Sequence, residues 1–288
     1  MNVPVRDRTH LVERAIEALG GSEALGPRVA PRAPEPPPAP AAPAAPAKPD
    51  VSLAALRAAG LIDAPEGQQR SRSVEEITVV QQQILRGMED VGAGRNRMVV
   101  VTSARPGEGK TFVATNLAAS MAANSTRKVI LVDVDGKRGS VSDLLANGEV
   151  NGLRSLAAQE RMAPPLLTCE VRNLLLLPYG KPVSGESVVP PGSQVSEALA
   201  RLARALPDHV LIIDTPPSLS TSDAHALSSI AGQVVVVVDA ERTQRNEVEA
   251  ALDMMEACPN LSLLLNRVCL TASDSFGAYG DYGAHKGG

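Results

Sequence analysis

Hydrophobic residues in the second half of the chain gather in short continuous runs, each followed by polar or glycine-rich sequence. Runs without polar alternation are typical of parallel strands that are covered on both faces. Residues 111–123, between two of these runs, have a helical pattern. We therefore expect a doubly wound α/β fold with a mostly parallel sheet. The expected strands are 98–102, 129–132, 174–177, 210–213, 234–238 and 261–265.

The first 95 residues have a different pattern, in which two helical parts are separated by a proline-rich part. Apolar residues recur at helical spacing over 11–19, so residues 1–25 are expected to hold one amphipathic helix. Residues 26–50 contain 10 of the 23 prolines, which predicts a semi-rigid linker without a core. Residues 51–95 are again helical in pattern. The first helix is thus tethered, and we expect it to dock on a partner; packing on its own domain is the alternative.

Composition excludes several classes of function. The 288 residues carry 28 basic and 32 acidic side chains, and only 2% are aromatic, which argues against a nucleic-acid-binding protein. Three cysteines without CxxC spacing predict neither a disulfide framework nor a zinc site, and the four histidines show no metal spacing. The longest apolar runs have strand length, and the N-terminus lacks an apolar signal region. We therefore expect a cytoplasmic protein.

The strongest motif lies directly after the first expected strand and before the first expected helix of that region. Residues 103–111 read SARPGEGKT and end in the GxGKT core of a Walker A loop. Gly107 and Gly109 allow backbone N–H groups to turn onto phosphates at a helix N-terminus. In such a loop Lys110 reaches the β- and γ-phosphates, and the Thr111 hydroxyl binds Mg²⁺.

Two residues of this loop depart from the simplest expectation. Ala104 stands where the general GxxxxGK[ST] pattern has its first glycine, so the loop is a variant. Glu108 lies between the two glycines and is expected to face solvent.

Three carboxylates follow two later strands. Asp133 and Asp135 end the strand at 129–132, and Asp214 ends the strand at 210–213. In an open α/β sheet, ligands bind at the carboxyl ends of the strands, so these acids can converge on nucleotide phosphates and Mg²⁺. Either segment alone is a weak signal, since an Asp often caps the helix or turn that follows. Three motifs in this order favour phosphoryl transfer, which needs positioning, a metal and a carboxylate near the nucleophile.

These motifs resemble the bacterial tyrosine kinases (BY-kinases), a family related to the MinD/ParA ATPases. The family pattern combines TSxxPGEGK[ST], hhhDxDxR and hhhDxPP with a tyrosine-bearing tail. The chain is most similar to the exosortase-associated tyrosine autokinases, which also begin with a helix like that at 12–19. The matching segments are 102–111, 130–138, 211–217, 222–224, 232–243 and 258–268.

The resemblance implies catalytic and metal-binding roles. Lys110 would hold the phosphates, and Asp133 would accept the proton of the tyrosine. Asp135 would assist the metal, and Asp214 would complete its shell through water. The implied metal set is Thr111, Asp133, Asp135 and Asp214.

The resemblance also implies a nucleotide-binding set. Asn266 matches the position at which relatives contact the adenine, and Arg105 aligns with the signature lysine of the MinD/ParA loop. Arg105 would touch phosphate within or across a subunit, and a solvated arginine is the alternative. The expected contacts to ATP are made by Arg105, Gly107, Glu108, Gly109, Lys110, Thr111, Phe112 and Asn266.

The division of the chain follows from these motifs. Residues 96–270 are the expected P-loop domain, and 271–288 are a flexible tail with Tyr279 and Tyr282 as phosphoacceptors. The resemblance implies phosphorylation in trans, self-association, and a transmembrane activator of the chain-length-regulator type in exopolysaccharide export. The chain would then be peripheral at the inner face of the plasma membrane, reaching it only through that partner. Residues 73–88 depart from the family, because Arg86 is the only basic residue where an ExxRxxR-like helix is usual.

Two other functions fit the same motifs. A MinD/ParA-like positioning ATPase would use Arg105 as its signature residue and would not need the tail. A regulatory subunit would bind nucleotide and gate polysaccharide export without kinase activity. Phosphate on the tail tyrosines separates the kinase from both.

Overall fold

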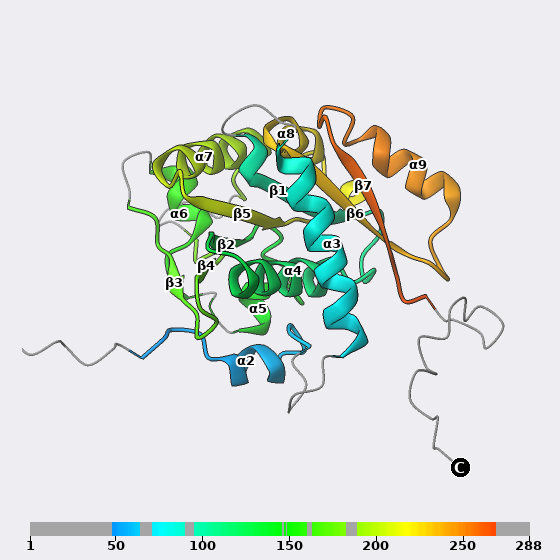
Figure 1. The fold of residues 1–288 in the computed structure, drawn as a ribbon. Helices are drawn as coiled ribbons and strands as arrows, with labels where there is room; N and C mark the ends of the chain where they lie inside the picture. The colour runs from blue at the N-terminus through cyan, green and yellow to red at the C-terminus, as the bar shows by residue number, and fades with distance from the viewer. Residues whose placement is uncertain are drawn as a thin grey trace, which may run out of the picture. The chain divides into compact units, whose positions relative to one another are not determined.

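A seven-stranded sheet runs through the middle of the protein (Figure 1). The strand order is β3-β4-β2-β5-β1-β6-β7, and all neighbouring pairs are parallel except β3 with β4. The predicted fold class is therefore confirmed. The strands are β1 (Met98–Ser103), β2 (Lys128–Asp133), β3 (Leu167–Thr168), β4 (Leu174–Leu177), β5 (His209–Asp214), β6 (Gln233–Asp239) and β7 (Leu261–Asn266).

The computed structural model describes part of the chain, between residues 48 and 268. The predicted helix within 1–25, nearly all of the linker at 26–50, and the tail at 271–288 with both phosphoacceptor tyrosines lie outside the described residues. The described residues are 48–63, 71–89, 95–145, 147, 149–159, 163–182 and 189–268. Within these ranges, no helix has the length and apolar character needed to cross a bilayer.

Helices cover both faces of the sheet, and each face has its own apolar core. One core lies under α2 to α5, and the other lies under α6 to α9, which follow the upper side of the sheet in Figure 1. Successive residues of a strand point to opposite faces, so Val99 and Val101 enter one core while Met98 and Val100 enter the other. The helices are α2 (Leu53–Ala58), α3 (Arg72–Glu89), α4 (Lys110–Asn124), α5 (Val141–Leu144), α6 (Leu153–Ala158), α7 (Gly192–Ala205), α8 (Ala224–Ile230) and α9 (Arg245–Asp253), with 3-10 turns η2 (Arg95–Arg97) and η3 (Ser218–Ser220).

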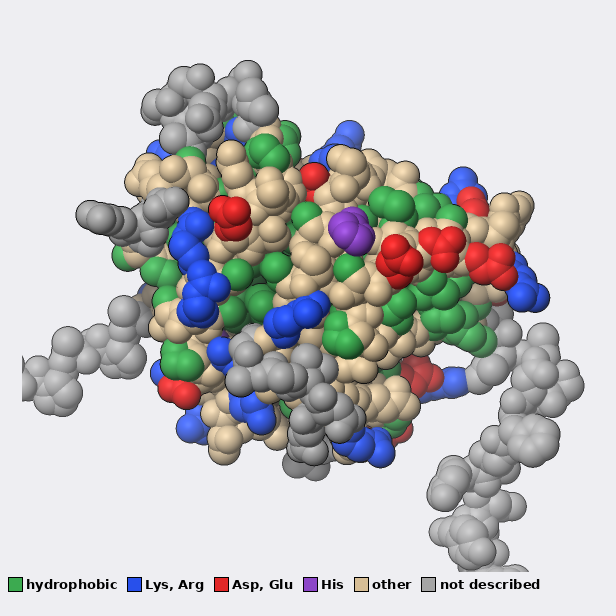
Figure 2. Space-filling view, turned by 90° about the horizontal axis from the view of Figure 1, so that it is seen from above, with side chains coloured by type: hydrophobic (Ala, Val, Ile, Leu, Met, Phe, Trp, Pro, Cys, Tyr) green, Lys and Arg blue, Asp and Glu red, His purple; other side chains and the backbone are tan. Residues whose placement is uncertain are grey.

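The last strand differs from its prediction. The continuous apolar run predicts burial on both faces, but Leu263 and Leu265 of β7 are 53% and 63% exposed. β7 is the edge strand, and α9 packs on its neighbour β6, so one row of β7 side chains stays uncovered. Figure 2, which views the molecule from above Figure 1, shows hydrophobic side chains bordered by acidic ones on the side where α9 lies.

The opposite edge of the sheet also contains an unpredicted feature. Val51 forms a parallel bridge with Cys169, next to the two-residue strand β3. Its N–H donates to the carbonyl of Thr168 at 3.0 Å, and its carbonyl accepts from the N–H of Glu170 at 2.8 Å. The segment at 51–95 therefore begins as an extended residue on the sheet, and the helix α2 starts only after the Ser52 N-cap.

Candidate functional site

The loop at 104–109 connects β1 to α4, as the sequence predicts. Gly107 and Gly109 have φ of 83° and 93°, a conformation that residues with a Cβ rarely adopt. A Cβ on Gly109 would also clash with the amide of Asn266. Ala104 has an ordinary φ and is buried, so alanine fits where the general motif has glycine. The loop thus presents its backbone at the N-terminus of α4, where anions bind.

Lys110 lies between two of the predicted carboxylates. Its Nζ is 2.7 Å from Asp135 Oδ2 and 3.7 Å from Asp214 Oδ1. The ammonium is 9% exposed. Burial alone would lower the pKa of Lys110, but the charges of Asp214, Asp135 and Asp133 together raise it. The lysine therefore stays charged and ready to neutralise phosphate.

Asp133 is fully enclosed at the end of β2. One of its oxygens accepts the N–H groups of Asp135 at 3.0 Å and Gly136 at 3.1 Å, and the other accepts that of Ser142 at 2.8 Å. The side chain has no exposed area. Asp133 thus fixes the loop that follows β2, and both of its oxygens are already engaged.

Asp214 lies beside Asp133 in the β2–β5 register and is also fully buried. No hydrogen bond of good geometry reaches either side-chain oxygen within the described residues. Burial raises the pKa of Asp214 from 3.8 to about 7, although the Lys110 charge works in the opposite direction. A buried carboxyl next to a P-loop, with Lys110 Nζ 3.7 Å from one of its oxygens, suits a further cation.

Asp135 is the third carboxylate, and it borders open space. Its Oδ2 accepts from Lys110, whereas its Oδ1 is buried without a hydrogen-bond partner among the described residues. The residue also lines a cavity of about 310 Å³ together with Lys137 and Tyr179. Asp135 therefore lies between the phosphate loop and this cavity.

Glu108 does not face solvent, and that prediction is wrong. Its side chain is 3% exposed and turns inward, away from the loop surface. The carboxylate accepts the N–H of Arg105 at 2.7 Å, the N–H of Asp239 at 3.4 Å, and the hydroxyl of Thr243. These three donors explain the burial, because a buried carboxylate needs hydrogen-bond partners. Its side chain ties the loop to the end of β6, leaving only its backbone for phosphate.

We predict that Glu108→Ala destabilises the protein. The substitution leaves two backbone N–H groups and one hydroxyl without their acceptor, which costs about 2–4 kcal/mol in free energy of unfolding. Urea denaturation followed by circular dichroism measures the loss. Glu249→Ala is the matched control, since Glu249 is 58% exposed and, among the described residues, forms its ion pair with Arg245 of the same helix. An equal loss in both variants would contradict this role of Glu108.

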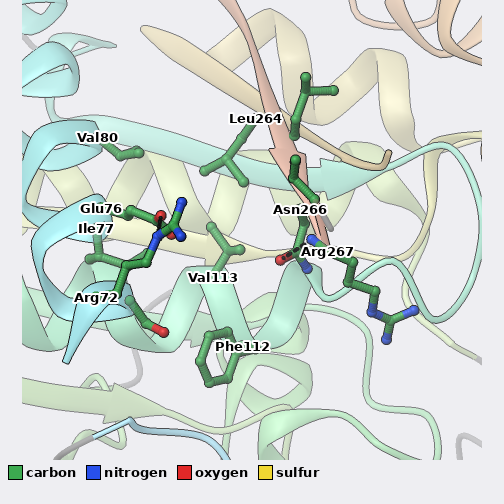
Figure 3. Close-up of a pocket in the computed structure, with 12 residues that line it drawn as sticks. Arg72, Glu76, Ile77, Val80, Phe112, Val113, Leu264, Asn266 and Arg267 are labelled. Carbon is green, nitrogen blue, oxygen red and sulfur yellow. Dashed lines mark hydrogen bonds and ion pairs between the residues drawn. The ribbon is translucent and has the colours of Figure 1, made fainter. Parts of the chain in front are cut away.

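A second pocket lies between α3, the start of α4 and the end of β7 (Figure 3). It has a volume of about 560 Å³, and Phe112 and Asn266 line it, as does Arg72. The Asn266 amide donates to the Glu108 carbonyl at 2.8 Å, so the pocket adjoins the phosphate loop. Its walls combine apolar residues with polar groups such as the amide of Asn266, and such a lining suits a nucleotide base.

Arg105 has a partner in its own chain. Its guanidinium lies 3.4 Å from Glu247 of α9, and the side chain is 56% exposed. The structure therefore directs this arginine toward α9, and contact with phosphate would require it to leave Glu247.

The comparisons with known proteins agree with this geometry. The family model described as ParA: NUBPL iron-transfer P-loop NTPase matches residues 94–277. The tyrosine-protein kinase CpsD of Streptococcus agalactiae is 31% identical over 192 residues, which cover 65% of this chain and 81% of the relative. The chain belongs to the bacterial tyrosine kinases, within the ParA-type P-loop NTPases. As P-loop NTPases, bacterial tyrosine kinases bind a nucleotide.

Other bacterial tyrosine kinases match over a similar region. Tyrosine-protein kinase YwqD of Bacillus subtilis is 30% identical over 64% of this chain and 78% of its own. Tyrosine-protein kinase wzc of Salmonella typhimurium is 30% identical over 67% of this chain but only 26% of its own length. The kinase domain of the Escherichia coli tyrosine kinase ETK shares the fold, with a TM-score of 0.53, 22% identity, and coverage of 72% and 87%. The chimerical protein CapA2B2 gives 0.54 at 25% identity, over 74% of this chain and 99% of that one.

Tyr179 has no place among the residues that the motifs predict. It lies in the loop after β4 and lines the cavity next to Asp135. Its position directly after a strand, at the carboxyl edge of the sheet, was the available signal. His209 and His225 line neither of these pockets.

Proposed function

We propose that this chain is an ATP-dependent protein tyrosine autokinase that regulates exopolysaccharide polymerisation or export. Its substrates would be Tyr279 and Tyr282 in the tail of a second copy. The observation that carries the proposal is the placement of Lys110 between Asp135 and Asp214 at the carboxyl edge of the sheet. The relatives named tyrosine-protein kinases support the same chemistry.

ATP and Mg²⁺ fit the residues that are present. The base would occupy the pocket of Phe112 and Asn266, with the phosphates at the loop and Lys110. Thr111 and the buried carboxylate of Asp214 would hold Mg²⁺, which neutralises phosphate charge during transfer. No cluster of three or more His, Cys, Asp or Glu able to hold a metal is found in the described part of the chain. A site with few carboxylates suits Mg²⁺, which usually binds one or two carboxylates together with substrate phosphates and waters.

Asp135 is the better placed proton acceptor. The tyrosine oxygen would bond to the γ-phosphorus while the bond from that phosphorus to the β–γ bridging oxygen breaks, releasing ADP. The phenolic proton would pass to Asp135 Oδ1, which has no hydrogen-bond partner among the described residues. The family resemblance implies Asp133 for this role, but both of its oxygens accept backbone N–H groups. We therefore assign Asp133 to holding the loop.

Activation would require a membrane partner. We propose a transmembrane protein of the chain-length-regulator type, to which the predicted helix within 1–25 would dock. The kinase would then be peripheral at the inner face of the plasma membrane. Self-association would bring one copy's tail to another copy's site.

Mixing two variants, one without the catalytic lysine and one without the acceptor tyrosines, tests transfer in trans. Lys110→Met keeps both acceptor tyrosines, whereas the double variant Tyr279→Phe/Tyr282→Phe keeps the active site. We expect neither variant alone to gain tail phosphate with ATP and Mg²⁺. Their mixture should gain it on the Lys110→Met chain, as mapped by mass spectrometry, with and without the partner's cytoplasmic segment.

The alternatives give different results in that experiment. ATP hydrolysis without tyrosine phosphate in the wild type, even with the partner segment, would point to the positioning ATPase. Nucleotide binding with neither hydrolysis nor transfer would point to the regulatory subunit. Either result would contradict the kinase.

A further inference from the structure

The cavity beyond Asp135 is separate from the nucleotide pocket. Its volume is about 310 Å³, at the small end of the roughly 300–1,000 Å³ range of ligand pockets. None of the phosphate-loop residues lines it, and Asp135 is the only one of the catalytic carboxylates that does. The cavity therefore meets the phosphoryl-transfer site at one carboxylate and has room for a single side chain.

Tyr179 forms a fixed aromatic wall of this cavity. Its N–H donates to Ser142 Oγ at 2.8 Å, and its carbonyl accepts the N–H of Arg154 at 3.1 Å. The Arg154 guanidinium carbon lies 5.7 Å from the centre of the ring. On another side the ring packs against Gly136, where a Cβ would clash with it. A ring held on several sides offers a rigid surface to a second aromatic group.

The charged residues at the cavity differ in whether they already have a partner. Asp135 is paired with Lys110, and Asp223 accepts the N–H of Gly192 at 3.1 Å. Lys137 is exposed at the cavity and forms no ion pair with any described residue. A carboxylate next to a bound side chain would therefore find a cation here.

The tail sequence has the matching chemistry. Within residues 277–288, Tyr279 and Tyr282 flank a single acidic residue, Asp281, and the other residues are glycine, alanine, histidine and lysine. Either tyrosine can enter a small cavity while the carboxylate of Asp281 remains outside it.

We propose that this cavity is the acceptor subsite and that it selects tyrosines with an acidic neighbour. The phenol ring of a second copy's tyrosine lies against Tyr179, and Lys137 binds Asp281 at the entrance. The inference rests on the proposed function, since an acceptor subsite has meaning only if the chain transfers phosphate to tyrosine.

The test uses the full-length Tyr279→Phe/Tyr282→Phe enzyme with the partner's cytoplasmic segment, and a peptide of residues 277–288 as acceptor. Steady-state kinetics give KM for the peptide and, separately, KM for ATP. Replacing Asp281 in the peptide by Asn should raise the peptide KM about threefold, and Lys137→Glu in the enzyme should raise it about tenfold. An Asp281→Lys peptide should recover most of the loss with the Lys137→Glu enzyme. Lys128→Glu, an exposed lysine at the start of β2, is the control for the change in net charge.

The wall is tested separately. Tyr179→Phe keeps the ring and should leave the peptide KM within about twofold, whereas Tyr179→Ser should raise it about tenfold with an unchanged KM for ATP. If the peptide KM changes neither with Lys137→Glu nor with the charge at position 281, the proposed selection for an acidic neighbour is overturned. If Tyr179→Phe raises the peptide KM as much as Tyr179→Ser does, the role of the Tyr179 ring as the wall of the subsite is overturned. If the Tyr279→Phe/Tyr282→Phe enzyme phosphorylates no peptide even with the partner's cytoplasmic segment present, the proposed function is overturned, and the subsite with it.

Discussion

Replacement of Lys110 by Met is expected to lower tyrosine phosphorylation by about 10²–10³-fold, the usual cost of losing one positioned charge-stabilising donor. Lys110 is the cation that lies between Asp135 and Asp214, at 2.7 and 3.7 Å from their oxygens. Without it, two buried carboxylates would face the incoming phosphates with no compensating charge. Single-turnover assays with radiolabelled ATP, performed on the wild type and on the variant with the partner's cytoplasmic segment present, measure the loss.

A loss of folding must be separated from a loss of chemistry in that variant. Removing one partner of a buried ion pair leaves the other charge uncompensated, which often costs about 3–5 kcal/mol. Thermal denaturation therefore accompanies the assay, and Lys128→Met is the control because Lys128 is exposed at the far end of β2. A folded Lys110→Met chain with activity within about threefold of wild type would contradict its place in the site.

Asp214→Asn is expected to abolish phosphorylation and, at the same time, to stabilise the nucleotide-free chain. Burial raises the pKa of this carboxyl from 3.8 to about 7. The folded chain therefore holds the proton more tightly than the unfolded chain does. The free energy of unfolding then falls as the pH rises from about 4 to about 7, and it stays low above that. Asparagine cannot ionise, so the Asp214→Asn variant lacks this fall in the free energy of unfolding.

Melting temperatures at two pH values measure the effect. Without nucleotide and Mg²⁺, we expect Asp214→Asn to melt roughly 3–8 °C above the wild type near pH 8, which is equivalent to about 2 kcal/mol. Near pH 5, where the wild-type carboxyl is already protonated, the difference should be much smaller. Asp253→Asn, at an exposed position of α9, should show neither change. A variant that is less stable than wild type near pH 8 would show that the Asp214 charge supports the fold.

The parallel strands could be predicted because each is a short and nearly continuous apolar run bounded by polar residues or proline. β4 has the predicted bounds, and the other predicted strands differ from theirs by one residue at each end or less. β3 was not predicted, because two residues carry no periodic pattern. The exposure of Leu263 and Leu265 was not predicted either, because burial of an edge strand depends on which helix lies over it.

The site was predictable only as far as its motifs. Lys110, Asp135 and Asp214 come together because their strands end at one edge of the sheet, which follows from the order of the motifs. The inward turn of Glu108 depends on Thr243 and Asp239, more than a hundred residues away, and local sequence does not reveal such a contact. Tyr179 meets Gly136 through the tertiary fold in the same way.

The strand order has a consequence for synthesis of the chain on the ribosome. β1, which leads into the phosphate loop, pairs with β5 from Leu211 and with β6 from Gln233 onward. At a translation rate of about 5–20 residues per second, β1 waits roughly 6–30 s for its two neighbours. During that time both of its edges and its valine-rich faces are bare. Expression at a low growth temperature or with abundant chaperones should therefore raise the yield of soluble protein more than changes to the buffer of the purified protein would.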